Sequence, residues 1–120
     1  MTEELIVNRV RSYSTGTPGR SLSQARNHHL VIDEPAYGGG PGEEITPAEA
    51  FLAGVSACGV LLLESFARQA GVPFQRAEVE IEGVRSRTDP SLFRQVNMRF
   101  HLVGPSRAQA EELVAAYQRR

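Results

Sequence analysis

The sequence contains no lysine and no tryptophan, and its only cysteine is Cys58. All thirteen basic residues are arginines, so Schiff-base chemistry on a lysine and a Walker-type phosphate loop are both excluded. A single cysteine cannot form a disulfide within the chain, and such usage is typical of reducing compartments. The sequence does not open on a basic stretch followed by an apolar core, so we expect no signal peptide and a cytoplasmic protein.

An excess of one sign of charge is also lacking, because the formal net charge is -1 at pH 7. A near-neutral balance gives no general attraction to nucleic acid or to a membrane surface, and we expect neither as a partner. The uncharged stretch Ala50–Leu63 is shorter than the about 20 apolar residues that cross a bilayer. With 41% hydrophobic and 22% charged residues, the composition predicts one soluble globular domain over residues 1–120.

A long helical pattern lies between Thr46 and Gly71, and the rest of the chain is organised around it. Thr46 is a good N-cap, Pro47 suits the first helical position, and Glu49 can complete a capping box. Gly71 supplies a left-handed end. The sequence therefore predicts one helix between these signals.

This helix is apolar on all its faces rather than along one stripe, which predicts burial on every side. Its apolar side chains include Phe51, Leu52, Val55, Val60, Leu61, Leu62 and Leu63. A chain of 120 residues has few other elements with which to cover such a helix. We therefore expect a second copy to cover it in a homodimer.

The segments on either side of the helix predict strands. Before it we expect strands at Glu4–Tyr13 and His29–Asp33, a turn at Ser14–Gly19 and a flexible loop at Gly38–Glu44, whereas Arg20–Asn27 is polar and ambiguous.

After the helix, Glu78–Arg87 and Gln95–Leu102 each alternate apolar and polar residues, which predicts a hairpin with one buried face. Ser106 and Gln109 can form a second capping box at the start of a last helix. The order of elements predicts an α+β fold in which antiparallel strands pack around a long buried helix.

The sequence gives little support for a metal site or a cofactor site. His28 and His29 are adjacent, so on a strand they face opposite sides, and with one cysteine a zinc site is not expected. The loop Gly38–Glu44 is not followed by the residues of a phosphate loop, and no Ser-His-Asp set or nucleotide fingerprint is present. We therefore expect neither a metal nor a cofactor.

Cys58 has two interpretations. It can be a small core residue, as a free cysteine in an apolar helix usually is, or it can be a reactive thiol. It lies about 18 Å along the axis from the start of the helix at ~1.5 Å per residue, beyond the reach of the helix dipole. A reactive thiolate would therefore need a cation from elsewhere in the chain, and arginine is the permanent cation available.

The residues around Cys58 resemble the OsmC/Ohr family. The shared pattern is Thr46, Pro47 and Glu49 followed, nine residues after the glutamate, by Ala57 and Cys58 in an Ala/Gly-rich helix. The order of the flanking elements is similar over nearly the whole chain. The resemblance implies an OsmC-like, intertwined homodimer with reactive sites at the subunit interface, and a thiol-dependent peroxidase that reduces organic hydroperoxides in oxidative-stress defence.

The resemblance also implies roles for individual residues. Cys58 would be the catalytic nucleophile and Arg26 would activate it, with Arg20 as the second match. Glu49 would hold the arginine in place. In the well-studied peroxidases a glutamate directly follows the proline, where this chain has Ala48, so Glu49 can serve either in the site or only in the helix cap.

The resolving cysteine of the family has no counterpart up to Arg120. Either the single domain of residues 1–120 lacks the C-terminal part of the family fold, or the protein lacks that thiol, and an external thiol reductant would complete the cycle. The apolar wall of Phe51, Val55 and Leu62 favours a small apolar hydroperoxide as the substrate. The alternative function is a non-catalytic dimeric binding module of the same fold with a structural cysteine.

Overall fold

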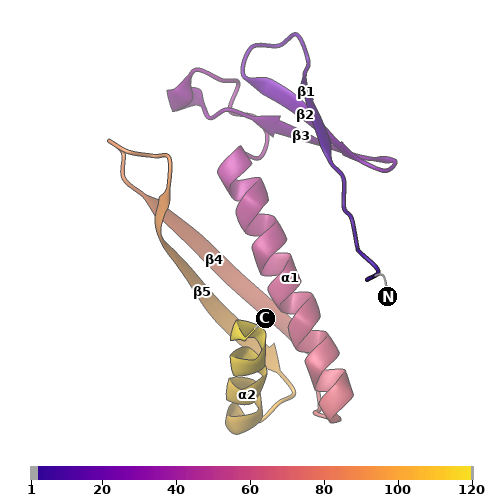
Figure 1. Ribbon diagram of the computed structural model, residues 1–120. Helices are drawn as coiled ribbons and strands as arrows, with labels where there is room; N and C mark the ends of the chain where they lie inside the picture. Colours follow the sequence, from indigo (N-terminus) through magenta and orange to yellow (C-terminus); the bar gives the residue numbers. More distant parts are fainter. Residues whose placement is uncertain (1–2, 120) are drawn as a thin grey trace. The chain divides into compact units, whose positions relative to one another are not determined.

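The computed structural model describes residues 3–119 (Figure 1). Its elements in chain order are β1 (Arg11–Ser14), β2 (Arg20–Ala25), β3 (His28–Asp33), the 3-10 helix η1 (Ala36–Gly38), α1 (Pro47–Ala70), β4 (Arg76–Arg85), β5 (Phe93–Val103) and α2 (Arg107–Gln118). Helices combined with antiparallel strands confirm the predicted α+β class. The chain divides into two compact units, Met1–Ala50 and Phe51–Arg120.

The first unit contains a three-stranded antiparallel sheet in the order β1-β2-β3 (Figure 1). β2 is the middle strand, with Leu22 opposite Tyr13 on β1 and opposite Val31 on β3. The polar segment that the sequence left ambiguous is this strand. Its side chains carry little apolar alternation, and backbone pairing with a neighbour on each side defines the strand instead.

The predicted N-terminal strand is shorter than expected. β1 begins at Arg11, and residues 3–10 have no regular secondary structure. The neighbouring strand explains the difference, because Arg11 pairs with Gln24 and β2 ends one residue later. Beyond Arg11 only one residue of β2, Ala25, is left to pair with. The ladder therefore ends here, and the apolar side chains of the preceding segment are exposed.

A tight turn at Arg26 and Asn27 joins β2 to β3. Arg26 has a φ of 55°, and a residue other than glycine in the left-handed region costs roughly 1–2 kcal/mol. The side-chain amide of Gln24 donates a hydrogen bond to the carbonyl of Arg26 at 3.1 Å. This bond stabilises the strained turn and holds Arg26 at the exposed tip of the β2–β3 hairpin.

The glycine-rich loop leads from β3 to α1 and folds back against the end of β3. The N–H of Glu34 donates to the carbonyl of Gly19 at 2.8 Å, and the carbonyl of Glu34 accepts the N–H of Gly42 at 3.2 Å. At Gly40 a Cβ would collide with the Glu34 carbonyl. Glycine is therefore required at this position for the close approach of two backbone segments.

The second unit combines the β4–β5 hairpin, α2 and most of α1. Its core consists of Leu63 and Ala67 from α1 and Leu113 from α2. Partly buried hydrophobic side chains pack against this core: Phe66, Val72, Phe74, Val79, Phe100, Leu102, Val114 and Tyr117. The apolar stripe predicted for the last helix therefore packs into the core of this unit.

The hairpin alternates as predicted. Val79 and Ile81 are partly buried, whereas the glutamates between and beside them are exposed. The register places Glu80 opposite Arg99, and their charged atoms lie 3.6 Å apart. Because both side chains are largely exposed, this pair contributes little to the stability of the hairpin.

Both predicted capping boxes are present. At α1 the N–H of Glu49 donates to Thr46 Oγ1 at 3.2 Å, and Glu49 Oε1 accepts the N–H of Thr46 at 2.9 Å. At α2 the equivalent bonds join Ser106 and Gln109 at 3.2 and 2.9 Å. α1 ends before Gly71, whose φ of 67° confirms the predicted left-handed end.

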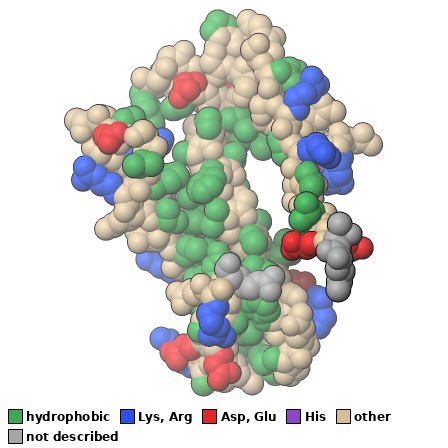
Figure 2. Space-filling model, viewed as in Figure 1, with side chains coloured by type: hydrophobic (Ala, Val, Ile, Leu, Met, Phe, Trp, Pro, Cys, Tyr) green, Lys and Arg blue, Asp and Glu red, His purple; other side chains and the backbone are tan. Residues whose placement is uncertain are grey.

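Within the single chain, the buried residues of α1 are Gly59, Leu63 and Ala67. Phe51 and Leu61 have 58% and 63% of their surface exposed, and Figure 2 shows hydrophobic side chains open to solvent along the middle of the second unit. The all-round burial predicted for this helix is thus not present in one chain. Cover by a second copy stays a prediction.

The apolar part of α1 is longer than its uncharged run indicated. Over an 18-residue window the mean hydropathy of α1 is 1.8, so its length and composition would allow it to cross a membrane. The uncharged run of residues 50–63 understates the apolar length of the helix. The core helices of soluble proteins have the same length and composition, so the absence of a membrane partner stays a prediction.

Candidate active site around Cys58

Cys58 lies near the middle of α1 and is exposed. The next residue, Gly59, is buried, and a Cβ there would lie 3.5 Å from Met98 Cε and from Tyr117 Cζ. Successive residues on a helix are rotated by about 100°. Cys58 therefore lies beside the face of α1 that packs on β5 and α2, and it is not a core residue of this chain.

The surface of α1 around Cys58 is apolar. Phe51, Gly54 and Leu61 lie on the same side of the helix as Cys58, since they are separated from it by seven, four and three residues. Phe51 is oriented by stacking on Phe93, with ring centroids 6.0 Å apart. Nothing lies within 4 Å of a Cβ built at Gly54. The thiol is therefore bordered by exposed apolar side chains, with open space one turn before it.

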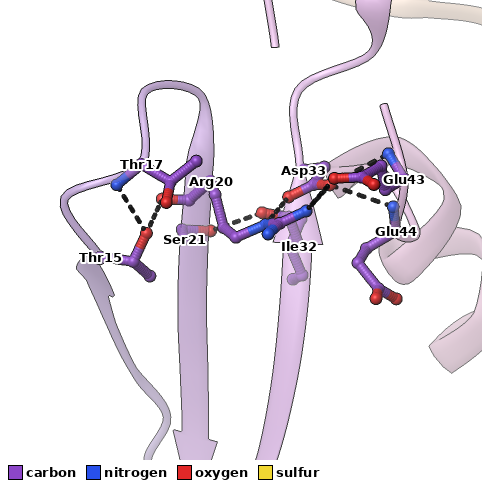
Figure 3. Close-up of polar contacts among 8 residues, drawn as sticks. All are labelled: Thr15, Thr17, Arg20, Ser21, Ile32, Asp33, Glu43 and Glu44. Atoms are coloured by element: carbon purple, nitrogen blue, oxygen red, sulfur yellow. Dashed lines mark hydrogen bonds and ion pairs between the residues drawn. The ribbon is translucent and has the colours of Figure 1, made fainter. Parts of the chain in front are cut away.

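A cluster of charged residues lies in the first unit, at the end of β3 (Figure 3). Arg20 donates from Nε to Asp33 Oδ1 at 2.8 Å and from Nη2 to Asp33 Oδ2 at 2.9 Å. The same Nη2 donates to Glu43 Oε1 at 3.1 Å. Asp33 Oδ2 also accepts the backbone N–H groups of Glu43 and Glu44, both at 3.1 Å. This carboxylate therefore joins β2, β3 and the glycine-rich loop.

Asp33 is fully buried, yet its surroundings favour the charged form. The hydrogen bonds from Arg20, reinforced by the N–H groups of Glu43 and Glu44, lower the pKa of Asp33 from 3.8 to about 2, although burial opposes the shift. The hydrogen bonds to Asp33, followed by that to Glu43, raise the pKa of Arg20. Arg20 and Asp33 are thus both charged, and they form an ion pair. Most of their hydrogen-bonding groups already have partners within the first unit.

Acid is expected to weaken this cluster. Because the pKa of Asp33 is about 2 in the folded protein and 3.8 without its partners, its contribution to stability is present above about pH 4 and disappears as the pH falls toward 2. Urea unfolding of the native protein and of Asp33→Asn measures this as a difference in the free energy of unfolding. That difference should shrink between pH 5 and pH 2. A difference that stays constant over this range would contradict the shift.

Glu49 and Arg26, two of the other predicted site residues, lie at separate places in the first unit. Glu49 is engaged in the helix cap, and its hydrogen bonds from Thr46, the backbone bond foremost, lower the pKa of Glu49. Arg26 lies at the tip of the β2–β3 hairpin. Cys58 belongs to the second unit. The assembly of Cys58, Glu49 and one arginine into a single site therefore stays a prediction.

Sequence reasoning missed the role of Asp33. It appeared there only as the last residue of a short strand. One signal was available, because an acidic residue that ends an apolar strand directly before a glycine-rich loop can accept the N–H groups of that loop. The partner, Arg20, was recognised only as a second candidate for thiol activation, since nothing in the sequence indicates that two residues 13 apart pair across adjacent strands.

The chain thus has an α+β fold with antiparallel strands, and its long apolar helix α1 carries an exposed thiol. Residues 40–120 match the family model described as OsmC-like protein. The chain therefore belongs to the OsmC-like family, which confirms the resemblance seen in the sequence. The matched range contains Glu49 and Cys58.

Solved structures show the same fold. An OsmC-like protein from Mycoplasma pneumoniae superposes with a TM-score of 0.83 at 16% identity, covering 96% of this chain and 82% of that one. An organic hydroperoxide resistance protein OsmC from Legionella pneumophila gives 0.66 at 22% identity, covering 94% and 82%. An organic hydroperoxide resistance protein from Elizabethkingia anophelis gives a TM-score of 0.66 at 18% identity, covering 95% of this chain and 82% of that one.

Identities this low establish the fold and leave the activity open. No curated protein matches the chain. The names of the Legionella and Elizabethkingia proteins connect those proteins to resistance against organic hydroperoxides. The function of this chain has to be argued from its own residues.

Proposed function

We propose that this protein is a thiol-dependent peroxidase that reduces organic hydroperoxides with Cys58 as the nucleophile. The exposure of Cys58 is the observation that carries the proposal. A structural cysteine in an apolar helix is expected inside the core, whereas a thiol that attacks a substrate must be reached from outside. Membership of the OsmC-like family and the names of two structural relatives support the same activity.

The chemical step is a displacement at oxygen. The Cys58 thiolate attacks the distal oxygen of the hydroperoxide, an S–O bond forms and the O–O bond breaks. The alkoxide that leaves takes up a proton and departs as an alcohol. The two electrons come from sulfur, which becomes a sulfenic acid. One external thiol then displaces water to give a mixed disulfide, and a second thiol releases reduced Cys58 as an external disulfide forms.

The surroundings of Cys58 favour an apolar substrate. Phe51 and Leu61 are exposed beside the thiol, and Val55 and Leu62 are partly buried on the same helix. An alkyl group of a hydroperoxide would remove these surfaces from water, gaining roughly 25 cal/mol per Å² of apolar area. Hydrogen peroxide has no such group, so organic hydroperoxides are the proposed substrate class.

Arg26 is the first candidate to activate the thiol, and Arg20 is the second. Arg26 takes part in none of the ion pairs found among residues 3–119, so its positive charge is uncompensated. The charge of Arg20 is balanced by Asp33 and Glu43. An uncompensated guanidinium stabilises a thiolate more strongly. Glu49 is proposed to orient the arginine in addition to capping the helix.

Alkylation of the native protein tests this proposal. Cys58 is expected to react with a fluorescent iodoacetamide before denaturation, because a thiol that acts as a nucleophile is accessible and activated. Arg26→Ala should slow this labelling at neutral pH, and Arg20→Ala should not. If Cys58 reacted only after denaturation, the protein would be the non-catalytic binding module with a structural cysteine.

We also propose that the active form is a homodimer in the cytoplasm, in which a second copy covers part of the exposed apolar surface of α1 and leaves the Cys58 thiol open to substrate. Sedimentation velocity should give a dimer at micromolar concentration. Leu61→Glu places a charge on that surface and should weaken the dimer, whereas Gln69→Glu, at an exposed polar position of the same helix, should not. A stable monomer of the native protein would contradict this prediction.

A further inference from the structure

An open groove of about 650 Å³ lies in the first unit, where the N-terminal segment passes the β2–β3 hairpin. It is lined by Asn8, Arg9, Val10, Arg11, Gln24 and Arg26. Three of these residues are arginines and none is acidic. Figure 2 shows basic side chains gathered on the part of the surface formed by this unit.

The side chain of Arg11 is held in position by two neighbouring groups. The guanidinium of Arg11 lies 4.6 Å from the centre of the Tyr13 ring, which orients it by a cation–π contact. Arg11 Nη2 donates to Gln24 Oε1 at 3.2 Å, and the amide of Gln24 donates to the carbonyl of Arg26 at 3.1 Å. Gln24 therefore contacts the side chain of Arg11 and the backbone of Arg26, and the Arg11 guanidinium needs less ordering when a ligand binds.

The charges of the groove are not balanced within the part of the chain that the structure describes. None of the ion pairs among residues 3–119 includes Arg9, Arg11 or Arg26. Arg26 also adopts a φ of 55°, and strained residues are concentrated at binding and active sites. The Arg20 cluster in the same unit shows the contrasting case, in which acidic groups occupy the guanidinium.

We propose that this groove binds a small oxyanion with at least two negative charges. Guanidinium groups present paired N–H donors that match the oxygens of phosphate and carboxylate groups. A long polyanion such as nucleic acid is disfavoured, because the protein has a net charge of -1 and a nucleic acid needs an extended basic surface. The groove shares Arg26 with the proposed peroxidase site, but the binding itself requires neither the Cys58 thiol nor a peroxide.

Isothermal titration of the full chain with pyrophosphate at low ionic strength tests the proposal. One saturable site is expected, and Arg11→Gln should weaken binding roughly tenfold, the effect of losing one charged hydrogen bond. Arg26→Gly should weaken it similarly while keeping the hairpin, because glycine is comfortable at this φ. The matched control Arg94→Gln changes an exposed arginine of β5 and should leave the affinity unchanged. A parallel titration with citrate distinguishes a phosphate ligand from a polycarboxylate.

Three results would overturn the proposal. The first is the absence of saturable binding of both pyrophosphate and citrate to the native protein. The second is unchanged affinity in Arg11→Gln or in Arg26→Gly, with circular dichroism showing that the variant is folded. The third is displacement of pyrophosphate by an equal concentration of a short DNA duplex, which would assign the groove to nucleic acid. If one variant fails to fold, the other decides.

Discussion

Replacing Cys58 with serine is expected to lower the rate of organic hydroperoxide consumption by roughly 10³-fold or more. A serine hydroxyl stays protonated near neutral pH and cannot form a sulfenic acid, so both the nucleophile and the oxidised intermediate are lost. The measurement is the initial rate of alkyl hydroperoxide loss in the presence of excess dithiol. The same assay without protein gives the background rate.

Ala57→Ser is the matched control for this variant. Residue 57 precedes the thiol on α1 and is also exposed, so the substitution adds a hydroxyl to the same part of the helix while Cys58 stays in place. Its rate should stay within about threefold of the native protein, because exposed substitutions rarely change stability by more than ~0.5 kcal/mol. If Cys58→Ser kept the native rate while folded, the peroxidase proposal would be wrong and the OsmC-like fold would stand.

Asp33→Asn is expected to cause the largest loss of stability among single polar substitutions in the first unit. The variant removes the negative charge that balances Arg20. In either orientation of the amide, its NH2 group faces N–H donors that now bond to an oxygen of Asp33. Breaking a buried ion pair on one side is strongly destabilising. For a chain of this size the melting temperature should fall on the order of 10 °C.

Glu43→Gln is the control for that prediction. Glu43 contacts the same guanidinium, but its side chain is 72% exposed. In the variant, water can therefore hydrate the guanidinium where the carboxylate was. Its melting temperature should fall by no more than about 3 °C. If Asp33→Asn and Glu43→Gln lowered the melting temperature by the same small amount, burial of the Asp33 carboxylate would not strengthen its contribution to stability. The description of Asp33 as the centre of this cluster would then be wrong.

Much of the fold could be predicted because its signals are local. The capping residues Thr46 and Glu49, the left-handed Gly71 and the alternation of the β4–β5 hairpin each determine structure within a few residues. Strand β2 could not be predicted, since its polar residues give no alternation and its existence depends on pairing with β1 and β3. The early end of β1 depends on the same non-local pairing.

The site was predictable only in part, for a similar reason. Cys58 could be named from its spacing to Glu49, and its exposure distinguishes it from a core cysteine. The choice of arginine depends on which guanidinium already has an acidic partner, and that is a tertiary property. Arg20 is paired with Asp33, whereas Arg26 is strained and exposed at the hairpin tip. The resemblance placed Arg26 before Arg20, but no feature of the sequence shows which of the two has an acidic partner.

A single-turnover experiment tests most directly the proposal that Cys58 itself reduces the peroxide. Reduced protein is mixed with one equivalent of an alkyl hydroperoxide in the absence of external thiol, and a cyclic dione traps any sulfenic acid before peptide mass analysis. The proposal predicts one equivalent of alcohol and a trapped adduct on Cys58. An unmodified Cys58 thiol, with the hydroperoxide unconsumed or with the oxygen on Met98 instead, would contradict it.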